Sequence, residues 1–143
     1  MQIADPIKEK IILALDVDSI AKATPIVQAL GPHVGCFKVG LELITAAGAP
    51  AVVQLIHKHG GQVFLDAKFS DIPNTVAGAV RCAAGLGVKF FTMHASCGPE
   101  ALEIAQKNKG QSKCLAVSVL TSLDETICEN IFGAPPETKV PQF

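Results

Sequence analysis

A short apolar run followed by a helical stretch recurs along the chain, and this repeat limits the possible folds more than any other feature. The apolar runs cover residues 11–17, 36–40, 62–68, 89–96 and 113–120. Stretches with helical spacing of Ala, Val, Ile and Leu lie between them, each ending in glycine, at residues 19–31, 46–61, 74–87 and 98–110. Strands that alternate with helices predict a parallel sheet of βαβ units, and the nearly continuous apolar strands predict a sheet covered on both faces.

Polar residues recur at the ends of the predicted strands, and their spacing distinguishes two possible sheets. Asp16, Lys38, Asp66, His94 and Ser122 follow one another at intervals of 22, 28, 28 and 28 residues. A doubly wound sheet concentrates its chemistry at one switch point, whereas a barrel gathers groups from many strand ends around one mouth. The regular spacing therefore favours an α/β fold of the TIM (β/α)8 barrel class.

The number of units is smaller than a whole barrel needs. A TIM barrel has eight βα units in about 250 residues, whereas this chain of 143 residues has about five. We therefore expect residues 1–143 to form a single, truncated barrel domain, the product of a fragment or of an interrupted gene. The proline-rich tail, residues 134–143, has neither a strand nor a helix pattern and stays unassigned.

Composition excludes several classes of partner. The chain has 12 basic and 13 acidic residues and no basic stripe, which argues against binding to nucleic acid or to an anionic membrane. No apolar run approaches the ~20 residues of a membrane span, and the N-terminus does not resemble a signal peptide. We therefore expect a cytoplasmic protein. The five cysteines contain no CxxC pair, so we expect buried free thiols and neither a disulfide framework nor a metal site.

The stretch FLDAKFSDIPNT, residues 64–75, concentrates charge in an otherwise apolar chain. Asp66 and Lys68 are two residues apart on a predicted extended strand, so their side chains should point the same way, with Asp71 just beyond in the loop. A structural ion pair, with Asp71 or Asn74 capping a helix that begins at Pro73, is a sufficient explanation of this motif alone.

Two further charges favour a functional site over a structural pair. In a barrel, Asp16 and Lys38 would face the same mouth as the charges of residues 66–71, and a single ion pair does not require so many charged groups. A lysine held between carboxylates is a proton donor and neither a base nor a Schiff-base amine. A fixed carboxylate repels an anionic leaving group, and the neighbouring ammonium stabilises and protonates the developing carbanion. This chemistry fits loss of CO2 from an anionic substrate.

The segments LALDVD, FKVG, FLDAKFSDIPNT, TMHAS and AVSVLTS, in this order and spacing, resemble the orotidine 5'-phosphate decarboxylase family. The resemblance covers about residues 11–122. Related sugar-phosphate decarboxylases and aldolases share the Asp-x-Lys-x-x-Asp pattern but not the IPNT continuation. The resemblance implies conversion of orotidine 5'-monophosphate to uridine 5'-monophosphate and CO2, without a cofactor, as the last step of pyrimidine nucleotide synthesis.

The same resemblance implies individual roles. Lys68 is similar to the family's proton donor to C6 of the pyrimidine, and Asp66 to the carboxylate beside the substrate carboxylate. Asp16 and Lys38 are similar to the family's ribose-contacting pair, with Lys38 also in the catalytic set, and Ser122 to the serine that contacts the pyrimidine ring.

The resemblance also implies a homodimer. In the family, the counterpart of Asp71 reaches across the dimer interface into the partner's site, accompanied by those of Ile72 and Thr75. The family binds the substrate phosphate through a glutamine, backbone amides and an arginine after strands six to eight, which this chain does not contain. Arg81, the only arginine, is expected on a solvated helix face. We therefore expect little activity from this polypeptide alone.

Two other functions stay open on the sequence. One is a magnesium-dependent sugar-phosphate decarboxylase or aldolase of the same superfamily, which chelator would inhibit. The other is a half-barrel without catalytic activity, which would aggregate or require a complementary chain because its sheet edges are open. His94 either points near the mouth or only bonds its neighbours, and it is left out of the predicted catalytic set.

Overall fold

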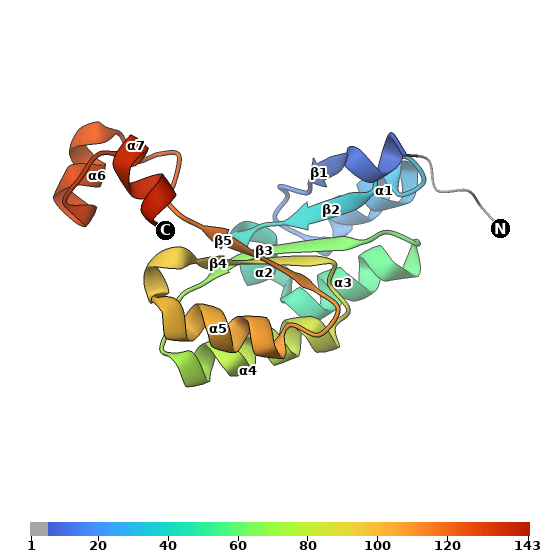
Figure 1. Ribbon diagram of the computed structural model, residues 1–143. Coiled ribbons are helices and arrows are strands. Elements are labelled where there is room, and N and C mark those ends of the chain that lie inside the picture. Colours follow the sequence, from blue (N-terminus) through green and yellow to red (C-terminus); the bar gives the residue numbers. More distant parts are fainter. Residues whose placement is uncertain (1–5) are drawn as a thin grey trace.

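Five parallel strands form one sheet in the order of the sequence (Figure 1). The computed structural model describes residues 6–143; the first five residues, on which part of the expectation about the N-terminus rests, lie outside this range. The strands are β1 (Ile12–Ala14), β2 (Cys36–Val39), β3 (Val63–Phe69), β4 (Phe90–His94) and β5 (Lys113–Val117). All five lie within the predicted runs apart from the last residue of β3, so the parallel βαβ order is confirmed.

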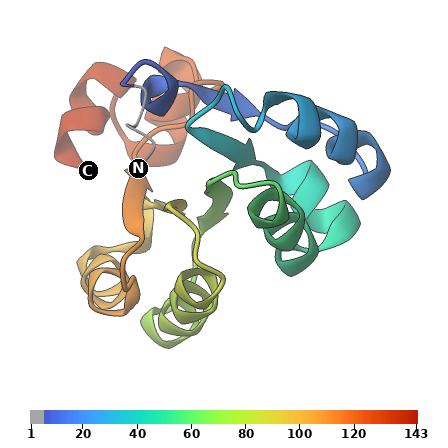
Figure 2. The same cartoon turned by 90° about the vertical axis from the view of Figure 1, so that its right-hand side faces the viewer.

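Helices follow the strands and lie as an arc along one side of the sheet (Figure 2). They are α1 (Ile20–Leu30), α2 (Leu41–Ala47), α3 (Ala49–Lys58), α4 (Pro73–Gly85) and α5 (Pro99–Asn108), with short 3-10 helices η1 (Lys8–Lys10) and η2 (Ala95–Cys97). The prediction of a single helix over residues 46–61 was wrong in its bounds, because α2 ends and α3 begins within this range. Gly48, at φ +79°, ends α2 and precedes α3, a conformation that glycine adopts without steric cost.

The C-terminal part of the chain contains helices that the sequence analysis missed. They are α6 (Glu125–Phe132), α7 (Pro136–Lys139) and the 3-10 helix η3 (Val140–Gln142), and they project beyond the carboxyl end of the sheet (Figure 1). The prediction that residues 134–143 lack a helix pattern was therefore wrong. Pro136 occupies the first helical position, where its missing N–H has no intrahelical partner to lose, and the Phe132 and Phe143 rings meet edge to face at 5.5 Å.

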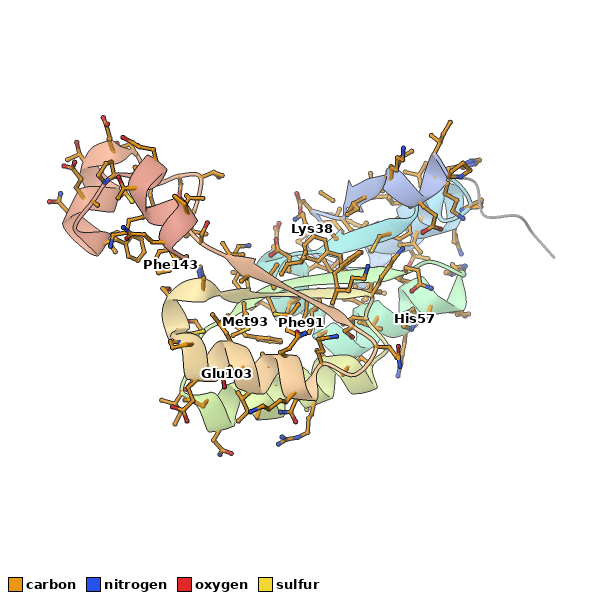
Figure 3. All side chains as sticks on the ribbon, in the orientation of Figure 1. Lys38, His57, Phe91, Met93, Glu103 and Phe143 are labelled. Atoms are coloured by element: carbon orange, nitrogen blue, oxygen red, sulfur yellow. The ribbon has the colours of Figure 1, made fainter. Side chains whose placement is uncertain are left out.

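The hydrophobic core lies between the sheet and its helices. Phe37, Val39, Leu65, Phe91 and Met93 alternate with the residues of the other face along their strands, and all five are buried. Figure 3 shows Phe91 and Met93 between the sheet and α4 and α5, with Lys38 on the opposite side. The helices thus bury one face of the sheet and leave the other to the charged side chains.

The second face of the sheet is not covered by helices. Ile12 on the β1 edge is 47% exposed and Leu115 on the β5 edge is 40% exposed. The expectation of a sheet covered on both faces was therefore wrong for residues 6–143, because the helices pack against one face only. Within residues 6–143, no helix has the length and apolar character needed to cross a bilayer.

The cysteines are all free but do not share one environment. Cys36 and Cys128 are buried, Cys97 and Cys114 are partly buried, and Cys82 is exposed on α4. The prediction of buried free thiols was therefore wrong for Cys82. Burial raises the pKa of Cys36 to about 11, so its thiol stays protonated at neutral pH.

Candidate active site

The ammonium of Lys38 lies between two carboxylates from neighbouring strands. Its Nζ is 3.5 Å from Oδ1 of Asp16 and 3.7 Å from Oδ2 of Asp66. Asp16 follows β1 by two residues, and the backbone N–H of Leu15 donates to the Lys38 carbonyl at 2.9 Å. This bond extends the pairing of β1 with β2 past the end of β1, and it holds Asp16 beside Lys38.

A second lysine completes the row. Nζ of Lys68 lies 2.8 Å from Oδ1 of Asp66, so Asp16, Lys38, Asp66 and Lys68 alternate in sign across three strands. The side chains of Lys38 and Lys68 are each 28% exposed and that of Asp66 is 15% exposed, whereas that of Asp16 is 66% exposed. The structure therefore brings together four of the predicted site residues, with Asp66 at the least solvated position.

Asp66 is held in its charged form. Partial burial by itself raises the pKa of this carboxyl, but hydrogen bonds from Lys68 and Thr92, together with the charges of Lys68 and Lys38, outweigh it and lower the pKa below its ordinary value. A carboxylate fixed in this way is an anion that a substrate must approach. Such a group can repel a second anion placed against it.

The backbone that carries Asp66 and Lys68 is a bulge. Leu65 pairs with Phe91 and Phe69 pairs with Met93, so β3 advances four residues while β4 advances two. Lys68 lies inside this bulge at φ 50°, the left-handed region that non-glycine residues rarely adopt. The prediction that the Asp66 and Lys68 side chains point the same way was right, but the regular extended strand from which it was argued was wrong.

Thr92 belongs to this site and was missed by the sequence analysis. It is the single residue of β4 opposite the bulge, it is 4% exposed, and its Oγ1 donates to Oδ1 of Asp66 at 2.9 Å. The same oxygen accepts from the backbone N–H of Lys68 at 2.8 Å. A threonine in an apolar strand run is the feature that could have identified it, because a buried hydroxyl needs a hydrogen-bond partner.

No hydrogen bond or ion pair within residues 6–143 joins Asp71, Ile72 or Thr75 to the charged row. All three are exposed, and Asp71 Oδ1 accepts from the backbone N–H of Ile72 at 2.7 Å. None of the ion pairs in residues 6–143 includes Asp71. Helix α4 begins after Ile72 without a side-chain cap, so the hypothesis that Asp71 or Asn74 caps it was wrong. Pro73 does begin α4, as predicted.

The remaining candidates lie at strand ends or on the surface. Ser122 is exposed in the turn between β5 and α6, and His94 is the partly buried last residue of β4, whose carbonyl accepts from the Cys97 thiol at 2.7 Å. Arg81 is exposed on α4 and donates to Asn108 on α5 at 3.2 Å. This contact places Arg81 on the helix layer, away from Lys38.

Among the described residues, no metal-binding cluster coincides with the charged row, and an apolar cavity beside β3 is lined by other residues. In the part of the chain that the structure describes, no group of three or more His, Cys, Asp or Glu side chains could hold a metal ion. An apolar cavity of about 230 Å³ lies on the helix side of β3. Its lining residues are Ile44, Ala49, Pro50, Leu65, Ala67, Phe69, Cys82, Ala83 and Leu86. The charged row thus remains the candidate active site.

Comparison with known proteins identifies the family of the chain. A sequence model of the orotidine 5'-phosphate decarboxylase / HUMPS family matches residues 9–138. The chain belongs to this family. Among its curated relatives, the orotidine 5'-phosphate decarboxylase of Moorella thermoacetica is 48% identical over 126 residues, covering 82% of this chain and 50% of the relative. That of Geotalea daltonii is 46% identical over 134 residues, covering 89% of this chain and 56% of the relative.

Solved structures of the family have the same arrangement of strands and helices. The chain matches orotidine 5'-phosphate decarboxylase from Lactobacillus acidophilus with a TM-score of 0.83 and 33% identity, over 92% of this chain and 63% of that one. The match to the Methanocaldococcus jannaschii enzyme complexed with the inhibitor BMP has a TM-score of 0.69 and 27% identity, over 76% and 51%. The five βα units of the chain therefore correspond to part of the family's barrel, and the chain spans about half the length of the curated relatives it matches.

Proposed function

We propose that this chain carries the charged catalytic groups of an orotidine 5'-monophosphate decarboxylase, which forms uridine 5'-monophosphate and CO2 without a cofactor. The alternating row of Asp16, Lys38, Asp66 and Lys68 is the observation that carries the proposal. The names of the curated relatives support it. The proposal places the reaction in pyrimidine nucleotide synthesis and in the cytoplasm.

In the proposed reaction, Asp66 and Lys68 have different roles. The substrate carboxylate is placed next to the Asp66 carboxylate, and the two negative charges repel each other. This repulsion ends when CO2 leaves. As the bond from C6 to the carboxylate breaks, its electron pair stays on C6, where the Lys68 ammonium stabilises it and then donates a proton. Water returns a proton to Lys68. We assign most of the proposed rate enhancement to this electrostatic role of Lys68.

The other residues of the proposal bind the substrate. Asp16 and Lys38 contact the ribose hydroxyls, for which a carboxylate acceptor and an ammonium donor 3.5 Å apart are suited. Ser122 contacts the pyrimidine ring from the turn after β5. Its exposed hydroxyl is compatible with a ligand contact at the mouth.

A homodimer is part of the proposal. Asp71, Ile72 and Thr75 form an exposed group after β3, and the Ile72 side chain is 67% exposed. In the proposed dimer these residues reach the site of the partner subunit, where Asp71 adds a further carboxylate. The absence of Asp71 from the ion pairs of residues 6–143 leaves its carboxylate available for that contact.

Binding of the substrate phosphate requires groups beyond those described here. In the family these groups follow later strands, and the chain spans about half of its relatives' length. Binding energy from a remote phosphate supports the chemical step as well as affinity. We therefore expect little decarboxylation by the chain alone, and substantial activity when the later strands of a relative are supplied.

The test is an ultraviolet assay for loss of orotidine 5'-monophosphate, run with chelator present. The chain is assayed alone and as a chimera in which residues 1–122 are joined to the corresponding later part of the Moorella thermoacetica relative. Lys68→Ala is compared with Lys107→Ala, which removes a lysine on α5 that is 75% exposed. We expect an active chimera that Lys68→Ala inactivates and Lys107→Ala does not change.

The other functions predict different results. Activity that chelator abolishes would support a magnesium-dependent sugar-phosphate enzyme and contradict the proposal. An active chimera in which Lys68→Ala has no effect would remove the proposed proton donor. A well-folded chimera without activity would favour the half-barrel without catalytic function.

A further inference from the structure

The bulge in β3 creates a hydrogen-bonding problem at Lys68. In a regular parallel ladder a backbone N–H donates to a carbonyl of the neighbouring strand, but β3 has two more residues than β4 between the paired positions Leu65–Phe91 and Phe69–Met93. The N–H of Lys68 donates instead to the side chain of Thr92 at 2.8 Å. The Thr92 hydroxyl therefore takes the place of a carbonyl of the neighbouring strand as the acceptor for the Lys68 N–H.

The hydroxyl of Thr92 is used in both directions. While its oxygen accepts from the Lys68 N–H, its proton is donated to Oδ1 of Asp66 at 2.9 Å. The same Oδ1 receives the Lys68 ammonium at 2.8 Å. Thr92, Asp66 and Lys68 thus form a closed ring of contacts that includes a backbone atom and the side chain of the same lysine.

The ring fixes a conformation that the backbone alone does not favour. A non-glycine residue at φ 50° persists only where its surroundings hold it there. Thr92 is 4% exposed and restricted at χ1 by its β-branch, so its hydroxyl is itself held in place. Water has little access to replace it.

We propose that Thr92 is a positioning residue of the candidate active site, which holds the Asp66 carboxylate and the Lys68 backbone in register with each other. This inference deepens the proposed function, because Thr92 would act on the reaction through Asp66 and Lys68. The ring of contacts itself does not depend on the identity of the substrate, so it can be tested without turnover.

The variants separate the hydroxyl from the space it fills. Thr92→Val keeps the β-branched shape but removes both hydrogen bonds, whereas Thr92→Ser keeps the hydroxyl. Ser112→Ala is the matched control, since Ser112 is also buried and its hydroxyl donates to the Val88 carbonyl at 2.6 Å, away from the charged row. It reports what loss of any buried hydroxyl does to this fold.

The readouts are NMR titration of the Asp66 side-chain carboxyl and hydrogen exchange of the Lys68 amide, both in the full chain. In Thr92→Val we expect the Asp66 midpoint to rise and the Lys68 amide to exchange at least tenfold faster, beyond any change shared by other β3 amides. Thr92→Ser should stay close to the parent chain. Ser112→Ala should change stability without moving either readout. An unchanged Asp66 midpoint and Lys68 amide in Thr92→Val would overturn the proposal.

A measurement on the unchanged chain covers the case in which Thr92→Val does not fold. The Thr92 hydroxyl proton should exchange slowly and show a close contact to the Lys68 amide proton; rapid exchange without that contact would also overturn the proposal. In the active chimera, Thr92→Val should lower kcat more than it changes KM, with recovery in Thr92→Ser. A chimera inactive in every variant counts against the proposed function, while the NMR result still decides the role of Thr92.

Discussion

Nζ of Lys38 lies 3.7 Å from Oδ2 of Asp66, and this contact joins the carboxylate of β3 to the cation of β2. The other oxygen of Asp66 receives Lys68 and Thr92. Each oxygen of Asp66 therefore faces a different lysine ammonium. The two lysines thus make separable contributions to the charge state of Asp66.

Lys38→Met should raise the pKa of Asp66, because the Lys38 charge is one of the contributions that lower it. Methionine keeps most of the length of the side chain, so the change is mainly one of charge. NMR titration of the Asp66 carboxyl measures the effect. Lys107→Met on the surface of α5 is the control, and an equal Asp66 midpoint in the two variants would contradict the prediction.

Asp66→Asn should reduce the loss of stability in acid. The pKa of Asp66 is lowered in the folded protein, so its contribution is fully present above the ordinary value of about 3.9 and is lost as pH falls through the folded value. Asparagine does not titrate. Urea unfolding between about pH 2 and pH 7 should therefore show a smaller fall in the free energy of unfolding for the variant, although it is less stable than the parent at neutral pH.

The Glu9–Lys89 pair should leave the stability of Asp66→Asn still partly dependent on pH, and this remaining dependence is an internal reference for the experiment. The pKa of Glu9 is lowered by a hydrogen bond and by the charge of Lys89, whose Nζ is 2.9 Å from Glu9 Oε2. This pair is remote from the charged row and is unchanged in Asp66→Asn. A variant and parent with parallel pH profiles would mean that Asp66 does not carry the predicted linkage.

Much of the fold follows from patterns that are local in sequence. The apolar runs predicted all five strands, because a strand buried against helices must be apolar at alternate positions at least. The charged row was predicted for a related reason: the carboxyl ends of parallel strands meet at one edge of a sheet, so Asp16, Lys38 and Asp66 had to lie together.

The contributions of Thr92 and of the bulge could not be read from spacing alone. A bulge depends on how two strands far apart in sequence are paired, so the left-handed backbone of Lys68 becomes visible only when Phe69 is seen opposite Met93. The missed helix α6 is a different case. Asp124 caps its first turn by accepting from the Ile127 N–H at 2.9 Å, and Gly133 ends it at φ +78°, both of which are recognisable sequence features.

Two glycines should respond to alanine with opposite signs. Gly48 has a φ of +79° at the junction of α2 and α3, so Gly48→Ala should lower the free energy of unfolding by about 1 kcal/mol or more. Gly78 lies inside α4 with nothing within 4 Å of an added Cβ, and Gly78→Ala should raise it by about 0.5–1 kcal/mol. Urea unfolding measures both. Equal effects would mean that the junction is not held in the positive-φ conformation.

Thiol reactivity should rank the cysteines by exposure and ionisation. The thiolate is the reactive form, and with a pKa of about 11 the thiol of Cys36 is ionised to roughly a thousandth at pH 8. Cys82 is exposed on α4. In the folded chain a disulfide reagent should therefore label Cys82 in the fastest phase and Cys36 in a much slower one, as followed by absorbance and by mass spectrometry of peptides.

Cys82→Ser and Cys36→Ser test this ranking separately. The first should remove the fastest phase and leave the rest of the time course unchanged, because no other cysteine of residues 6–143 is exposed. The second should leave the fastest phase intact. Labelling of Cys36 at a rate close to that of Cys82 would mean that β2 opens to solvent readily. The open β1 edge would then be the place to look for that motion, since Cys36 pairs with Ile12, which is 47% exposed.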